Sequence, residues 1–156
     1  MPTARTRTLL MRLRAHGLPV LCTLAPETVA PGVIADLTAM GVTVAAGHSA
    51  ATAEQTERAL AEGLAGFTHL FNAMPQMSSR APGMVGAALN SEAYCGIIAD
   101  GHHVDDRMVK LAFRARPIAG RMVLVSDAMS TIAGPDYFTL YGETIRVLDG
   151  KLVNAN

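Results

Sequence analysis

Five short apolar runs, each followed at once by polar residues, constrain the fold of this chain more than any other feature. The runs cover residues 20–24, 42–46, 66–70, 96–99 and 122–126, and helix-length segments separate them. Because the runs are apolar throughout rather than alternating, both faces of each strand should be covered, which is typical of a parallel sheet under helices. The pattern therefore predicts an α/β protein in which strands and helices alternate.

Capping signals predict where the helices begin. Thr52 and Gln55 have the spacing of a capping box, and Asp105 or Asp106 can cap a later helix. The apolar positions of that later helix that should face inward are Met108, Val109, Ala112 and Phe113. Near the N-terminus, Leu9, Leu10 and Leu13 lie among four arginines ahead of Gly17, which favours an amphipathic helix over a targeting peptide.

The character of the chain changes after the last apolar run. Residues 137–141, 144–148 and 151–153 look like short antiparallel strands, and Asp149-Gly150 is a hairpin turn signal between the last two. We therefore expect two parts, a partial barrel over residues 1–134 and the start of a small β segment over residues 135–156. Residues 72–86 are rich in proline, glycine and methionine, which favours a binding loop or a lid.

Composition excludes several classes of protein. Half of the 156 residues are apolar, and thirteen basic residues balance thirteen acidic ones, so no nucleic-acid-binding surface is indicated. No apolar stretch approaches the ~20 residues needed to cross a membrane. Cys22 and Cys95 each lie inside an apolar run, where a small thiol packs as an apolar residue. We expect a soluble protein of the reducing cytoplasm.

The polar residues that follow the apolar runs are candidates for one composite site. The carboxyl ends of parallel strands face the same way, so side chains that are distant in sequence converge there. In chain order the candidates are Glu27, His48, Ser49, His69, Asn72, Asp100, His102, His103 and Asp127.

His48 and His69 are the candidate metal ligands. Two imidazoles on adjacent strands are well placed to share one divalent ion, zinc in the first place, with iron, cobalt or another ion as alternatives. A catalytic site normally supplies three protein ligands, and Glu27 is a candidate for the third. Since Pro26 precedes Glu27, we rank a carboxylate at the start of a helix ahead of that role. Taken singly, either histidine could instead only hydrogen-bond a loop backbone.

Asp127 ends the last apolar run and is the candidate proton carrier. A carboxylate there can take a proton from metal-bound water and hand it to a leaving nitrogen, although an aspartate after a strand often only caps a turn. The guanidinium of Arg80 fits a phosphate, and the backbone N–H groups around Asn72 and Ala73 could hold further phosphate oxygens. An exposed arginine that is merely solvated is the alternative for Arg80. In the segment Asp100-Gly101-His102-His103, one histidine could orient a polar substrate.

Six short motifs follow one another between residues 21 and 128. They are Thr-Leu-Ala-Pro-Glu, Ala-Gly-His-Ser, Thr-His-Leu-Phe-Asn-Ala-Met-Pro, Arg-Ala-Pro-Gly, Gly-Ile-Ile-Ala-Asp-Gly-His-His-Val-Asp and Leu-Val-Ser-Asp-Ala. In order and approximate spacing, this string resembles the N-acetylglucosamine-6-phosphate deacetylases of the amidohydrolase superfamily. Each motif is weak alone, whereas six in register are a strong signal.

The resemblance implies an incomplete (β/α)8 TIM barrel of the metal-dependent hydrolase type, with about five parallel strands and a short antiparallel C-terminal segment. It implies that a divalent metal ion is held by His48, His69 and a glutamate upstream of both, and that Asp127 is catalytic. It also implies substrate contacts. For the sugar phosphate these match Asn72, Ala73 and Arg80, the arginine reaching across a dimer interface, and a further contact matches Asp100, Gly101, His102 and His103, with His103 as the family histidine.

The implied reaction is hydrolysis of the acetamide of N-acetylglucosamine 6-phosphate to glucosamine 6-phosphate and acetate. Metal-activated water would attack the amide carbonyl, and Asp127 would carry the proton to the departing amine. The chain begins just before what looks like the fourth barrel strand and lacks the Glu-Gly-Pro motif of the family, so we expect a fragment with impaired activity. Its expected partners are an amino-sugar phosphate and either a second copy or a complementary N-terminal half. The alternatives are a non-catalytic sugar-phosphate-binding or assembly fragment, and an amidohydrolase for another N-acyl substrate.

Overall fold

The computed structural model describes residues 4–154, and the chain divides into two compact units, Met1–Val125 and Ser126–Asn156. Each unit has its own sheet. The predicted division into residues 1–134 and 135–156 stays a prediction. Within residues 4–154, no helix is both long enough and apolar enough to cross a membrane.

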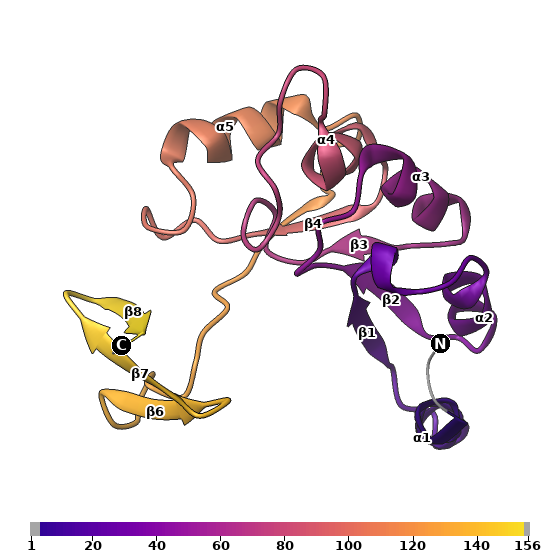
Figure 1. Cartoon of the computed structure of the whole chain (residues 1–156), viewed down its shortest axis with the longest axis horizontal. Coiled ribbons are helices and arrows are strands. Elements are labelled where there is room, and N and C mark those ends of the chain that lie inside the picture. The colour runs from indigo at the N-terminus through magenta and orange to yellow at the C-terminus, as the bar shows by residue number, and fades with distance from the viewer. Residues whose placement is uncertain (1–3, 155–156) are drawn as a thin grey trace. The chain divides into compact units, whose positions relative to one another are not determined.

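The first unit is built on a five-stranded parallel sheet in which consecutive strands are neighbours (Figure 1). Its strands are β1 (Leu21–Leu24), β2 (Thr43–Ala46), β3 (Gly66–Phe67), β4 (Tyr94–Ile97) and β5 (Met122–Leu124). Its helices are α1 (Ala4–Ala15), the 3-10 turn η1 (Pro26–Thr28), α2 (Val33–Ala39), α3 (Ala53–Ala61), α4 (Gly83–Asn90) and α5 (Asp106–Ala115). A (β/α)8 barrel needs eight such strands to close, so this is an incomplete barrel, which confirms the predicted fold class.

Side-chain caps fix the start of two helices, as the sequence predicts. The Thr52 side chain accepts a hydrogen bond from Gln55 N, and the Gln55 side chain accepts one from Thr52 N, which makes the capping box at α3 complete. Asp105 caps α5 by accepting from the backbone N–H of Arg107. The loop prediction for residues 72–86 was too long, because α4 already begins at Gly83.

The core lies between the helices and the middle strands. α3 packs against α4 and α4 packs against α5, so these helices lie side by side along the sheet (Figure 1). Apolar side chains of β2, β3 and β4 are buried beneath them, whereas Phe113 on α5 is 47% exposed, contrary to the prediction that it faces inward. β1 and β5 form the two edges, and Leu21 and Leu124 on them are each 67% exposed.

Arg116 connects the end of α5 to the end of α4 and to the segment before β4. This buried residue follows α5, and its guanidinium donates through Nη1 to the carbonyl of Ala88 and through Nη2 to the carbonyl of Ala93. Ala88 lies in the last turn of α4, and Ala93 lies just before β4. One cation therefore satisfies carbonyl groups at the end of one helix and ahead of the next strand.

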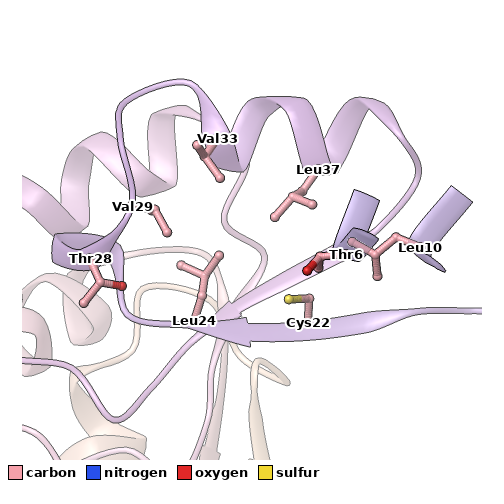
Figure 2. A pocket seen from close by; sticks show the side chains of 8 residues that line it. All are labelled: Thr6, Leu10, Cys22, Leu24, Thr28, Val29, Val33 and Leu37. Carbon is pink, nitrogen blue, oxygen red and sulfur yellow. The ribbon is translucent and has the colours of Figure 1, made fainter. Parts of the chain in front are cut away.

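A mostly apolar cavity of about 270 Å³ lies over β1, between α1 and α2. Figure 2 shows Cys22 and Leu24 of β1 lining one side of it and Val33 and Leu37 of α2 lining the other. The remaining lining residues are Thr6, Leu10, Thr28 and Val29. The cavity leaves Cys22 half-buried, whereas Cys95 on β4 is fully buried.

In the folded protein, we expect Cys22 to react with a thiol reagent and Cys95 not to react. Burial raises the pKa of the Cys95 thiol to about 11, against a partial opposing effect of the Arg116 charge. A raised pKa leaves little of the thiolate, which is the reactive form. A colorimetric thiol assay should count one fast thiol in native protein and two in denaturant. Cys22→Ser should remove the fast one, and two fast thiols in native protein would contradict the prediction.

The second unit is a three-stranded antiparallel sheet, as the sequence predicts. Its strands are β6 (Tyr137–Leu140), β7 (Glu143–Leu148) and β8 (Lys151–Asn154), in that order. Both connections are two-residue turns, Tyr141-Gly142 and Asp149-Gly150, in which every residue has a positive φ. Type I′ hairpin turns require that conformation, and they match the twist of the strands they join.

Candidate functional site

The candidate residues of the first unit follow the carboxyl ends of its strands. Glu27 lies in η1 after β1, His48 lies two residues after β2, and His69 lies two residues after β3. Asp100 lies three residues after β4. Since the strands are parallel and neighbouring, these positions lie at one edge of the sheet.

The rings of His48 and His69 lie together at this edge. Their centroids are 4.7 Å apart, and the ring planes meet at 81°, an edge-to-face arrangement. His69 is buried, whereas His48 is exposed. The Nδ1 atom of His69 is buried and has no hydrogen-bond partner within residues 4–154, which costs on the order of 1–3 kcal/mol unless a ligand meets it.

Backbone geometry brings the two histidines together. A Cβ added to Gly47 would come within 2.0 Å of the Thr68 side-chain methyl, Cγ2, so any other residue at position 47 would require Thr68 to move. His48 and His69 themselves have positive φ values of 48° and 28°. Such a conformation costs a residue other than glycine on the order of 1–3 kcal/mol, and it persists only where surrounding contacts hold it.

Glu27 binds the loop that carries His48. Its Oε2 accepts a hydrogen bond of 2.6 Å from Ser49 Oγ, and its Oε1 accepts one of 2.6 Å from Ala50 N. Burial alone would raise the pKa of Glu27, but these hydrogen bonds and one from its own backbone outweigh burial, so the pKa lies below its ordinary value. Glu27 also lies in the first turn of η1, the position expected of a carboxylate at the start of a helix.

No third ligand joins the two imidazoles in the described part of the chain. Within residues 4–154, no group of three His, Cys, Asp or Glu side chains lies close enough together to hold a metal ion. The described residues therefore bring together two candidate ligands, the imidazoles of His48 and His69.

The predicted phosphate contacts follow β3. Asn72 N donates to the carbonyl of His69 at 3.0 Å, so Asn72 belongs to the same tight turn as the histidine. Ala73 has a φ of 51°, and its carbonyl accepts a hydrogen bond of 3.1 Å from Ser49 N. Arg80 is exposed in the following loop.

An open cleft of about 470 Å³ adjoins His48. Its lining comes from the loops after β1, β2 and β3, and it joins a candidate metal ligand to a candidate phosphate contact. Ala50, Met74 and Pro75 line it although the sequence did not single them out; only their position next to candidate residues could have indicated them. The full lining is Glu27, His48, Ser49, Ala50, Ala73, Met74 and Pro75.

Asp100 organises its own segment. Its Oδ1 accepts hydrogen bonds of 2.9 Å from the backbone N–H groups of His102 and His103, and its Oδ2 lies 2.6 Å from His103 Nδ1. The hydrogen bonds from the backbone N–H groups of His103 and His102, of which that from His103 has the largest effect, hold the pKa of Asp100 well below its usual range. Because a carboxylate can only accept, His103 Nδ1 donates, and Nε2 is left for another partner. Gly101 and His102 are exposed.

Asp127 belongs to the second unit, where it is exposed and has a φ of 49°. It lies three residues beyond the end of β5. The roles assigned from sequence to Asp127, to the two imidazoles and to the substrate contacts stay predictions.

Comparison with known proteins identifies relatives of one kind. The chain is 46% identical over 134 residues to an N-acetylgalactosamine-6-phosphate deacetylase of a Shewanella species, covering 85% of this chain and 32% of the relative. It is 35% identical over 138 residues to the N-acetylglucosamine-6-phosphate deacetylase of Haemophilus influenzae, covering 86% of this chain and 36% of the relative. The chain thus spans about a third of the length of these relatives. No protein-family model matches it.

Solved structures agree with the sequence relatives. The N-acetylglucosamine-6-phosphate deacetylase of Pasteurella multocida superposes with a TM-score of 0.87 at 35% identity, covering 98% of this chain and 40% of that one. A mutant N-acetyl-D-glucosamine-6-phosphate deacetylase of Mycobacterium smegmatis, in complex with N-acetyl-D-glucosamine-6-phosphate, superposes with a TM-score of 0.83 at 33% identity. That match covers 92% of this chain and 38% of the mycobacterial one.

Proposed function

Over the segment that it spans, this chain belongs to the family of N-acetylglucosamine-6-phosphate and N-acetylgalactosamine-6-phosphate deacetylases, and on that premise we propose that it takes part in hydrolysing the acetamide of such a sugar phosphate. The products would be acetate and the amino-sugar 6-phosphate. The observation that carries the proposal is the pair of imidazoles 4.7 Å apart, beside a cleft that Ala73 also lines.

The residues present supply two of the three protein ligands that a catalytic divalent metal ion normally has. Two neighbouring imidazoles suit zinc, iron or cobalt, and the buried, unpartnered Nδ1 of His69 is an atom that a ligand would satisfy. His48 and His69 would hold the ion. When bound, it would polarise the amide carbonyl and lower the pKa of a water molecule.

The side chains of the chain itself would supply proton transfer and substrate binding. In the proposed reaction, water oxygen bonds to the carbonyl carbon, the carbon–nitrogen bond breaks, and Asp127 takes the proton from water and passes it to the departing amine. The backbone N–H of Ala73 would hold the phosphate, since that of Asn72 already donates to the carbonyl of His69, and Arg80 would contact the phosphate from a second copy of the chain. Both cysteines of the described residues are free thiols, which accords with a cytoplasmic location.

Acetate release tests this proposal. The protein, supplied with Zn²⁺ or Co²⁺, should release acetate from N-acetylglucosamine 6-phosphate or from its galactose epimer, and far less from unphosphorylated N-acetylglucosamine. Arg80→Ala should reduce turnover of the phosphorylated sugar. The galactose epimer is included because the Shewanella relative bears that name.

The same assay separates the alternatives. Calorimetric binding of the sugar phosphate without acetate release would favour a non-catalytic binding fragment and reject hydrolysis. Equal turnover with and without the phosphate, unaffected by Arg80→Ala, would favour a different N-acyl substrate. If the protein neither bound nor hydrolysed the sugar phosphate in the presence of metal, the proposal would be overturned entirely.

A further inference from the structure

The loops after β1, β2 and β3 are linked by hydrogen bonds that meet at Ser49. The Ser49 side chain is buried, its Oγ donates to Glu27 Oε2, and its N–H donates to the carbonyl of Ala73. The same Oγ accepts a hydrogen bond of 3.1 Å from Ala51 N. Glu27 additionally accepts from Ala50 N, so it holds the loop after β2 at two successive residues.

These hydrogen bonds stabilise a backbone conformation that is unfavourable on its own. His48, directly before Ser49, has a φ of 48°, and Ala73 has a φ of 51°. Both residues pay a conformational cost in this region, so the loops need contacts that make the conformation the favoured one. The bonds from Ser49 and Ala50 to Glu27 are short and involve a charged acceptor, which makes them strong contacts for holding the loop after β2.

We propose that Glu27 is a positioning residue that acts through Ser49: it fixes the direction of His48 and the place of Ala73, and so sets the spacing between the imidazole pair and the loop that follows β3. Within residues 4–154, no third His, Cys, Asp or Glu side chain lies close enough to the imidazole pair to hold a metal ion with it, which distinguishes this role from that of a third metal ligand. The consequence for ligand binding rests on the proposed function. The hydrogen-bonded link among the three loops does not depend on the proposed function.

Hydrogen exchange tests the link without metal or substrate. In Glu27→Gln, the amide nitrogen cannot accept from Ser49 Oγ, although the side-chain oxygen can still accept from Ala50 N. The Ser49 amide, which donates to Ala73, should then exchange about tenfold faster. Glu57→Gln is the matched control, because it makes the same change of charge at an exposed position on α3. Unchanged Ser49 exchange in a folded Glu27→Gln protein would overturn the proposal.

Cobalt binding tests the consequence. Loss of a residue that orients a metal ligand typically weakens metal affinity about 10-fold to 100-fold, and we expect the lower end for Glu27→Gln and for Ser49→Ala. The two effects should not multiply in the double variant, because one acts through the other. If the losses of cobalt affinity in the two single variants multiplied in the double variant, the proposal that Glu27 acts through Ser49 would be overturned. Loss of binding in Glu27→Gln with the His48 ring resonances and the Ser49 exchange unchanged would make Glu27 a ligand and likewise overturn it.

A conservative variant guards against a purely structural effect. Glu27→Asp keeps the carboxylate but shortens its reach, so it should restore part of the Ser49 protection that Glu27→Gln loses. Equal exchange in all three proteins, with only the midpoint lowered, would assign Glu27 to folding stability alone. Failure to release acetate, with the exchange effect intact, would reject the proposed function and leave the positioning role standing.

Discussion

Replacing Asp127 with asparagine is expected to lower the rate of acetate release by about 100-fold to 10,000-fold, which is the range that general acid–base catalysis contributes. Asparagine keeps the size and shape of the side chain, but it cannot take up a proton at neutral pH or deliver one to the departing nitrogen. The protein should stay folded, because Asp127 is exposed and lies outside both sheets. The measurement is initial-rate acetate release with N-acetylglucosamine 6-phosphate and Zn²⁺.

Asp136→Asn is the matched control, since this second exposed aspartate of the same unit precedes β6. It should retain the starting rate. Cobalt affinity should stay within about twofold in both variants, because proton transfer and metal binding are separate tasks of separate residues in the proposed mechanism. A fall of less than tenfold for Asp127→Asn would remove this residue from the proposed reaction.

Replacing Arg116 with methionine should destabilise the fold by about 3 kcal/mol, near the upper end for hydrogen bonds to a charged group. Methionine preserves much of the apolar stem but removes the Arg116 donor from the carbonyl groups of Ala93 and Ala88, of which Ala88 keeps the hydrogen bonds from Ser91 N and Oγ. The end of α4 and the segment before β4 would lose the group that connects them to α5. Chemical denaturation followed by circular dichroism should show the loss as a lower midpoint.

Arg114→Met provides the control for this change. Arg114 lies in the last turn of the same helix and is exposed, so its loss should change the free energy of unfolding by less than about 0.5 kcal/mol. Arg116→Lys should fall between the two, because an ammonium group lacks the planar fork that reaches two carbonyls at once. A midpoint for Arg116→Met equal to that of Arg114→Met would show that the two hydrogen bonds contribute nothing.

The sequence was sufficient for what depends on local chemistry. The capping box of Thr52 and Gln55, the cap by Asp105 and the turn at Asp149-Gly150 each involve residues close together in the chain, so their spacing predicts them. Uniformly apolar runs likewise predicted a parallel sheet, and with it the convergence of His48 and His69 at one edge.

Contacts between distant residues could not be predicted in this way. The bond between Glu27 and Ser49 joins residues 22 positions apart, and Arg116 reaches carbonyls 28 and 23 positions away. No spacing rule marks such pairs, because a long or charged side chain can find its partner on any neighbouring element. The exposure of Phe113 was missed for a related reason: helical periodicity gives the apolar face of α5 but not how much of that face other elements cover.

At the residues with positive φ that follow the strands, the requirements of stability and of function conflict. His48, His69, Phe71, Ala73 and Asp127 all occupy a region of backbone space that glycine alone enters freely. Selection for a sturdier fold would favour glycine at such positions, whereas any requirement for an imidazole or a carboxylate there opposes it. The residues at these positions therefore reflect a compromise between stability and function. A variant designed for stability alone would lose these side chains first.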